Sequence, residues 1–379
     1  MDENGPGKMA ASGSQADMAA DFGAPSSVTE RDILLRRLAD LAVLPSGRMT
    51  PQERNLVDTV IAAAVSRLDD ASRRRLAERI AQLPEGPREL TLALARDTIE
   101  VAAPVLRASL GLQPTDLVQI VREFGPEHHL AIAGRKALPA AVTDALVEYA
   151  ASPAITRFLS NAAAEMSMRA LEVLVRRSAS EPEFQPLLLA RAEMTVRLAQ
   201  LMFWWVPSAA RIEILSRFSV ERRMMHDALD DVLEAGLAAA GADEALHATL
   251  SLVRPPVFLD KTLLTRLVNL AGTKRSDEFT ETMADGAHIH PETARRIVGD
   301  QGGEPLAVYG KAVGLTRKEF GDLIVAAAEI RLGDMPGRAD LERVTAVFDA
   351  ISTDRAAHVL HCWDWATSAE AQIPTQAES

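Results

Sequence analysis

Four side chains in the segment HVLHCWDWA, close to the C-terminus, are of the types that bind zinc: His358, His361, Cys362 and Asp364. Two histidines three residues apart lie on one face of a helix, and zinc sites usually hold four ligands in a tetrahedron. Cys362 is adjacent to His361 and therefore points elsewhere on a helix, and no second cluster of ligands stands nearby in the sequence. The alternative is an amphipathic helix with a tryptophan docked on the core. We expect no metal and no cofactor.

Two further pairs of histidines are of the residue type that can carry out acid–base chemistry near neutral pH. His128 and His129 follow GPE in a predicted loop, and His288 and His290 flank an isoleucine in GAHIHP. Neither pair has a nucleophile at a recognisable spacing, and loop histidines near helix starts are commonly solvated or capping groups. No paired carboxylates, nucleophile elbow or dinucleotide fingerprint stands in its required context. The sequence therefore predicts a protein that is not an enzyme, and an enzyme of unrecognised type, which would need a deep polar pocket, is kept as a further alternative.

A glycine-rich segment, GDQGGEP at 299–305, precedes a predicted helix. It lacks the Lys-Ser/Thr pair of a phosphate-binding loop and follows a helix instead of a strand, so a turn is the simpler interpretation. The two short helices that it joins, within 291–313, could form a helix-turn-helix. The second helix offers only Lys311 as a cation and begins with Glu304. A DNA-associated regulator is the alternative function that this segment leaves open.

Three arginines recur at similar places in the chain: Arg96, Arg135 and Arg191 each follow a small residue and precede an apolar residue by three positions. One interpretation is a row of guanidinium groups along one edge of a repeat array, available to an acidic partner. The other is a repeated structural role, either an ion pair or a hydrogen bond to a loop carbonyl. Repeated positions favour the structural interpretation, because they usually reflect repeated packing.

The segment LMFWWVP, residues 201–207, concentrates aromatic side chains in a chain that is only 4% aromatic. Trp204 and Trp205 are adjacent, so one narrow helix stripe cannot bury both. Tryptophan at a surface is a frequent anchor for protein partners, although large aromatic residues are mostly buried. We take Phe203, Trp204 and Trp205, with the three arginines, as candidate partner-binding residues, and core packing of the aromatic residues is the alternative.

The whole chain has 379 residues, 47% hydrophobic and 25% charged, with a net charge of −12. This composition is typical of a soluble globular protein of about two domains. The acidity argues against binding to nucleic acid or to anionic membranes and favours a basic protein partner. A single cysteine, no signal-peptide pattern and no long apolar segment predict a cytoplasmic protein without a membrane span.

The elements that position these residues are predicted to be helices throughout. Thr50, Pro51 and Glu53 form a capping box ahead of an apolar stripe with helical spacing, and Thr316 and Glu319 begin another helix in the same way. Similar segments, including about 87–110 and 185–203, continue to residue 366 with short loops and no strand pattern. The fold class is therefore predicted to be all-α.

Repeated helix pairs of about 40 residues suggest a HEAT-like helical-repeat array followed by a smaller helical cluster. The apolar pattern weakens in EAGLAAAGADEA, near 233–245, where we expect a change of packing. The predicted organisation is a disordered arm at 1–27, a repeat domain at 28–235, a second helical domain at 236–366 and a disordered tail at 367–379.

The runs LALARDTIEVAAPVL, TDLVQIV, IAGRKALPAAVTDALVEYA and LLLARAEMTVRLAQLMF resemble an uncharacterised bacterial domain family with HEAT-like helical repeats. The resemblance covers roughly residues 35–330 and rests on spacing, not on a catalytic signature. It implies an all-helical repeat fold and supplies no activity, substrate or site residue. The leading function predicted from the sequence is a noncatalytic scaffold or adaptor that binds a protein along a helical-repeat surface.

Overall fold

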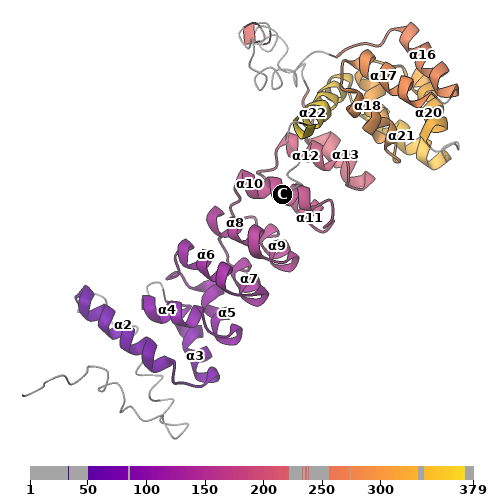
Figure 1. Cartoon of the computed structure of the whole chain (residues 1–379). Coiled ribbons are helices and arrows are strands. Elements are labelled where there is room, and N and C mark those ends of the chain that lie inside the picture. Colours follow the sequence, from indigo (N-terminus) through magenta and orange to yellow (C-terminus); the bar gives the residue numbers. More distant parts are fainter. Residues whose placement is uncertain are drawn as a thin grey trace, which may run out of the picture. The chain divides into compact units, whose positions relative to one another are not determined.

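The computed structural model describes residues 50–83, 86–221, 256–273, 275–331 and 337–371, together with 33, 233, 235, 236 and 238. Within these residues every regular element is an α-helix (Figure 1), and one isolated parallel bridge joins Leu138 and Ala164. The predicted all-α fold is confirmed for this part of the chain. None of the helices described there is both long and apolar enough to cross a membrane.

The chain divides into two compact units, Met1–Ser167 and Met168–Ser379. The boundary predicted at 235/236, near the weak apolar pattern of 233–245, falls where the structure describes only isolated residues, and it stays a prediction. The predicted N-terminal arm, 1–27, lies outside the described residues. The two units are considered separately below.

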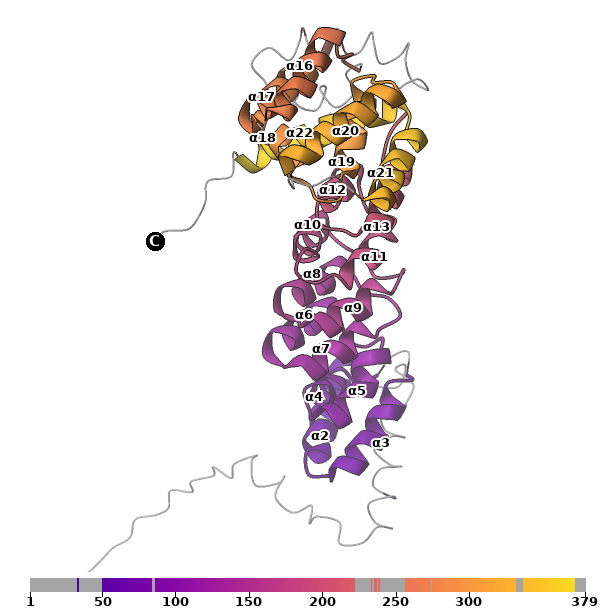
Figure 2. The same cartoon turned by 90° about the vertical axis from the view of Figure 1, so that its right-hand side faces the viewer.

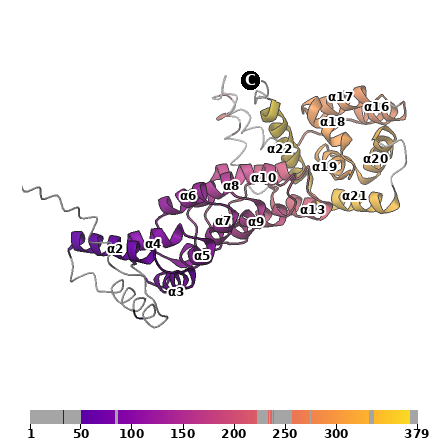
Figure 3. The same cartoon turned by 60° about the horizontal axis from the view of Figure 1, so that its bottom comes forward.

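Unit 1 contains eight described helices. They are α2 (Pro51–Val65), α3 (Asp70–Ile80), α4 (Arg88–Ala95), α5 (Ile99–Ala108), α6 (Pro114–Glu123), α7 (Pro126–Ala133), α8 (Ala140–Tyr149) and α9 (Ser152–Leu159). Helices two apart in the chain pack together: α3 with α5, α5 with α7 and α7 with α9 in one row, and α2 with α4 and α6 with α8 in the other. Figure 2 and Figure 3 show the two rows within this unit. The arrangement is compatible with the predicted helical-repeat array.

Local sequence chemistry explains where α2 begins. The Thr50 side chain accepts a hydrogen bond from the Glu53 backbone, and the Glu53 carboxylate accepts one from the Thr50 backbone at 2.8 Å. Pro51 occupies the first helical position, where the missing N–H removes no helical hydrogen bond. The predicted capping box is therefore confirmed, as is the one formed by Thr316 and Glu319 in unit 2.

Two expectations for unit 1 are wrong. The single helix expected over 87–110 is broken at 96–98 into α4 and α5, where the Asp97 carboxylate accepts hydrogen bonds from its neighbour Thr98 and from Arg73 of α3. The loop expected around His128 and His129 is the helix α7, which begins at a proline. Its short length explains why helical periodicity is hard to recognise there.

Unit 2 holds the remaining described helices. They are α10 (Met168–Arg177), α11 (Phe184–Leu189), α12 (Val196–Met202), α13 (Ser208–Arg217), α16 (Lys261–Gly272), α17 (Ser276–Ala287), α18 (Pro291–Gly299), α19 (Glu304–Ala312), α20 (Arg317–Arg331), α21 (Arg338–Ala350) and α22 (Thr353–Ala371). The central helix is α19, which contacts α18, α20, α21 and α22 and buries every residue except Lys311. Because α22 continues to Ala371, the first residues of the predicted disordered tail are helical instead.

Candidate protein-binding surfaces

The aromatic segment at the end of α12 packs against the C-terminal helix α22. The Phe203 side chain is fully buried, and its ring centroid lies 4.8 Å from that of Trp363. The centroid of the half-buried Trp204 ring lies 4.9 Å from that of Trp363, and the Arg296 guanidinium lies over the Trp204 ring at 4.3 Å from its centroid. Phe203 therefore belongs to the core of unit 2, and Trp204 keeps only part of its surface open.

Trp205 is also half-buried, and its indole Nε1–H donates to the Ser178 hydroxyl at 2.9 Å. The indole of Trp363, which the sequence analysis does not choose as a site residue, is almost fully buried and donates to the Gln200 side chain at 3.1 Å. Partner binding by Trp204 or Trp205 stays a prediction, because both retain exposed surface while serving the internal packing of unit 2.

Arg135 stabilises the C-terminal end of α5 in unit 1. Its guanidinium donates to the carbonyl oxygens of Leu106 and Ser109, both at 2.7 Å, at the C-terminal end of α5. These carbonyls have no helical donor of their own, so the arginine satisfies groups that a helix end leaves open. Burial lowers the pKa of Arg135 from its usual value. This geometry matches the structural interpretation of the recurring arginines.

The other two arginines lie in different settings. Arg96 is the C-cap of α4, is exposed, and donates to the Gln119 side chain at 3.2 Å. Arg191 is buried and forms an ion pair with Glu193 at 2.6 Å. Within unit 1, Arg96 follows a helix of one row and Arg135 follows a helix of the other. The similar sequence context of Arg96 and Arg135 therefore does not reflect equivalent positions in the fold.

The histidines contribute to packing and helix ends. His128 and His129 are buried in α7, where their Nε2 atoms bond the carbonyls of Asp97 and Val121 at 3.1 and 2.8 Å. The expectation that they are solvated loop residues is wrong. His288 is exposed and ends α17 with φ of 53°, the left-handed conformation common at helix C-termini.

The C-terminal cluster does not converge on one point. Cys362 Sγ lies 3.8 Å from His358 Nε2, and burial raises the pKa of the thiol to about 12. Asp364 instead accepts hydrogen bonds from the His290 backbone and the Thr293 hydroxyl, both at 2.7 Å, and so caps the start of α18. Within the described residues no group of three or more His, Cys, Asp or Glu side chains is placed to hold a metal.

The glycine-rich segment between α18 and α19 encloses a buried ionic network. The fully buried Glu304 accepts hydrogen bonds from Ser208 at 2.7 Å, Arg211 at 2.9 Å and Arg343 at 3.0 Å. Arg211 also forms an ion pair with Asp300 at 2.8 Å. Burial acts to raise the pKa of Glu304, but the hydrogen bonds and the two arginine charges prevail, and the pKa is lowered. The segment is a turn built around charged side chains, as its simpler interpretation expects.

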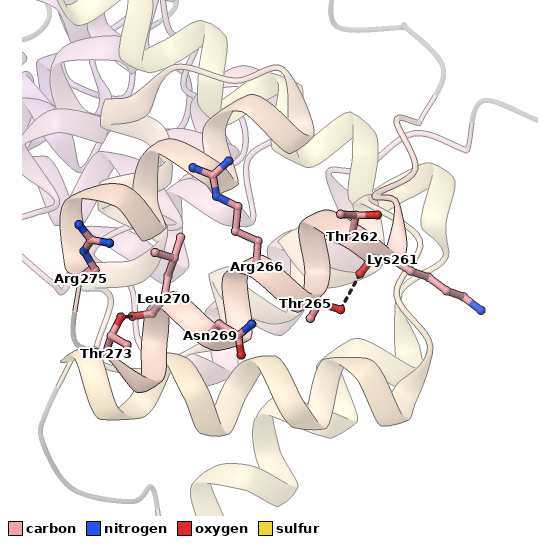
Figure 4. A pocket seen from close by; sticks show the side chains of 8 residues that line it. All are labelled: Lys261, Thr262, Thr265, Arg266, Asn269, Leu270, Thr273 and Arg275. Atoms are coloured by element: carbon pink, nitrogen blue, oxygen red, sulfur yellow. Dashed lines mark hydrogen bonds between the residues drawn. The ribbon is translucent and has the colours of Figure 1, made fainter.

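An open groove of about 700 Å³ runs along α16 in unit 2 (Figure 4). Lys261 lies at one end and Arg275 at the other, with the exposed Arg266 between them. Arg275 forms an ion pair with Glu278 at 2.6 Å. Neither Lys261 nor Arg266 forms an ion pair with a described residue, so the groove carries two unpaired positive charges.

Together these features define an all-α protein of two units whose predicted site residues mostly serve structural contacts. A family model described as an uncharacterised protein conserved in bacteria, DUF2336, matches residues 101–361. Because this match covers well over half of the sequence, the chain belongs to that family. No curated protein and no solved structure matches the chain.

Proposed function

We propose that this protein is a noncatalytic scaffold or adaptor that binds another protein along the helix rows of unit 1. The observation that carries this proposal is the stacking of α3, α5, α7 and α9, in which each helix contacts the next one in the row. Stacked helix pairs expose extended surfaces made of equivalent positions on successive helices, and repeat proteins use such surfaces to bind peptides and helices.

The chemistry of the described side chains supports a binding role over catalysis. The buried histidines bond backbone carbonyls, and the buried Glu304 is occupied by three donors. The thiol of Cys362, with its raised pKa, is a poor nucleophile at neutral pH. These groups all have structural partners, so none of them combines exposure with the activated state that catalysis requires.

The alternative, a DNA-associated regulator acting through 291–313, is less well supported. A recognition helix needs an exposed face for the major groove, whereas α19 buries every residue except Lys311. The Lys311 ammonium itself lies 4.7 Å from the centroid of the Phe348 ring. A net charge of −12 further opposes association with a phosphate backbone.

We propose a cytoplasmic location on the basis of the single cysteine, which fits a reducing compartment. The acidity of the whole chain favours a basic partner during diffusional approach. The charge required of the contacting segment is set locally by the surface that it meets, because screening limits the reach of exposed charges to about 10 Å.

The experiment is chemical cross-linking in bacterial cells that carry the full-length tagged chain, followed by affinity purification and mass spectrometry. The recovered protein is then purified and titrated against the full chain by calorimetry. We expect saturable binding of a defined protein with fixed stoichiometry. Recovery of no protein beyond that found with the tag alone, or recovery of DNA in its place, would contradict the scaffold function.

A further inference from the structure

The C-terminal ends of three helices in one row of unit 1 lie next to one another. Arg135, which follows α7, donates to the carbonyls of Leu106 and Ser109 at the end of α5. The Asn161 amide, which follows α9, donates to the carbonyls of Arg135 and Lys136 at 2.8 and 3.2 Å. Hydrogen bonds thus connect the end of α5 to that of α7 and the end of α7 to that of α9. We call residues 107–113, 134–139 and 157–167 the C-terminal edge.

The C-terminal edge carries a cation at the end of each helix. Arg107 lies in the last turn of α5, Lys136 follows α7 and Arg157 lies in the last turn of α9. All three side chains are exposed, and none forms an ion pair with any described residue. The edge contains a single acidic residue, Glu165, in a chain that is acidic as a whole.

Cations at helix C-termini are favourable because they face the negative end of the helix dipole. That effect is small for an exposed charge, and it leaves the charge free to interact with a further anion. The guanidinium of Arg135 shows the contrast, since both of its described bonds go to carbonyls within the fold. The exposed cations of the edge can therefore form ion pairs with a partner, whereas the Arg135 guanidinium is already bonded to carbonyls of the fold.

An exposed apolar side chain lies close in the chain to the first of these cations. Leu110 lies two positions beyond the end of α5 and three beyond Arg107, and it is 71% exposed, the most exposed large hydrophobic side chain of the described residues. An exposed leucine by itself is ordinary. Next to a line of cations it provides the combination of apolar contact and charged rim that protein interfaces use.

We propose that the C-terminal edge binds an acidic segment of a partner protein. This inference rests on the proposed scaffold function and specifies the chemistry of the partner. Packed helices lie about 8–10 Å apart, so cations on successive helices match acidic side chains three residues apart in a polyproline II peptide, which brings every third side chain to one face at a spacing of about 9 Å. An apolar side chain between the acidic positions would contact Leu110. The preference for an acidic segment at this edge is opposite to the preference of the whole chain.

Phosphate groups of a nucleic acid would meet the same three cations, but the observations favour a peptide. The sequence-independent affinity of a nucleic-acid binder grows with the number of phosphates that it neutralises, and three cations on an acidic chain neutralise few. Leu110 also gives a phosphate backbone no favourable contact. Duplex DNA is nevertheless one of the probes in the test.

The test measures fluorescence anisotropy with the full chain and three labelled probes. The first probe is a peptide of about twelve residues with glutamate at every third position and leucine and serine between, so that in the polyproline II conformation its glutamates match the helix spacing. The second has glutamine in place of glutamate, and the third is duplex DNA of about 20 base pairs. We expect the glutamate peptide to bind at least about tenfold more tightly than the glutamine peptide. Its affinity should fall as the salt concentration is raised, because salt screens the charges.

The variants assign the binding site. The double variant Arg107→Glu with Arg157→Glu should weaken the glutamate peptide by about tenfold or more, because two attractive charges become repulsive. Arg266→Glu on α16 is the matched control, since it reverses an equally exposed charge in unit 2, and it should change the affinity less than about twofold. Lys136→Glu provides an independent variant, and circular dichroism with thermal unfolding checks that each variant is folded.

The inference would be overturned by equal binding of both peptides, by a loss of binding in Arg266→Glu as large as in the double variant, or by tighter binding of DNA that the double variant abolishes. Failure of the glutamate peptide to bind at all would also overturn it. If the purified partner from the cross-linking experiment still binds the wild-type chain in that case, the scaffold function stands and only the assignment of this edge fails.

Discussion

The Arg211 guanidinium and the Glu304 carboxylate lie 2.9 Å apart in the interior of unit 2, although 93 positions separate them in the sequence. Arg343 and Ser208 donate to the same carboxylate. One buried acidic group therefore connects α13, α19 and α21. Its charge is tolerated in the interior because three donors and two positive charges surround it.

Replacing this carboxylate should destabilise unit 2 strongly. Glu304→Gln leaves Arg211 and Arg343 without their shared counter-charge, and breaking a buried ion pair typically costs about 3–5 kcal/mol. Urea unfolding followed by tryptophan fluorescence measures the loss. The control is Glu292→Gln on α18, whose side chain is 65% exposed and should contribute less than about 0.5 kcal/mol. Equal effects of the two substitutions would contradict the structural role of Glu304.

The stability of unit 2 should also depend on pH through Glu304. Its pKa in the folded state is lower than the ordinary value of 4.5. A carboxyl with a lowered folded pKa stabilises the fold above its unfolded pKa, and that contribution is lost as the pH falls through the folded value. We expect wild-type stability to fall more steeply below about pH 4.5 than that of Glu304→Gln. Parallel pH profiles of the two proteins, measured by thermal unfolding, would contradict this assignment.

Arg135 and Arg96 should differ in their importance for unit 1. Arg135→Met removes two charge-assisted hydrogen bonds to carbonyls that have no other donor, and should cost about 2 kcal/mol or more. Arg96→Met removes an exposed contact and should cost about 0.5 kcal/mol or less. Urea unfolding monitored by circular dichroism compares the two. A larger effect at Arg96 would indicate that the carbonyl contacts of Arg135 contribute little.

The aromatic segment should separate into core and half-exposed residues. Phe203→Ala removes a fully buried ring and should cost about 3–5 kcal/mol of stability. Trp205→Phe keeps an aromatic ring but removes the indole donor to Ser178, and should cost about 1 kcal/mol. Thermal unfolding and partner titration are measured on the same preparations. If Trp205→Phe weakens partner binding while the fold persists, Trp205 contacts the partner.

The single cysteine should report on the folding of unit 2. Burial raises the pKa of Cys362 to about 12, so almost no thiolate exists at pH 8 in the folded protein. Ellman's reagent should therefore label the native chain slowly and the urea-unfolded chain completely. Rapid stoichiometric labelling of the native protein would show that Cys362 is accessible.

The helices were the most predictable feature of this protein, because their signals are local. Thr50 and Glu53 lie three positions apart, and so do Thr316 and Glu319. Each capping box can therefore be recognised from four consecutive residues. Where a helix was missed, as at α7, the segment is too short to show a full apolar period.

The candidate sites were less predictable because their partners are distant in sequence. Asp364 caps α18 through groups 71 and 74 positions away, and no local pattern indicates that role. Arg96 and Arg135 share a sequence context, yet they end helices in different rows. The cations of the C-terminal edge share no sequence motif, since only the packing of α5, α7 and α9 brings together the helix ends that carry them.

The sequence separation of the contacts has a consequence for synthesis on the ribosome. In the described part of unit 1, the side-chain hydrogen bonds are short in sequence, and the bond from the Leu90 backbone to Asp58 spans 32 positions. Each helix of this unit can therefore pack soon after it leaves the ribosome. In unit 2, Trp363 bonds Gln200 over 163 positions. The face of α12 that packs on α22 therefore stays uncovered until α22 has been synthesised. If translation stopped before α22, the released chain would still expose this face of α12. Chaperones and proteases recognise such exposed apolar surface.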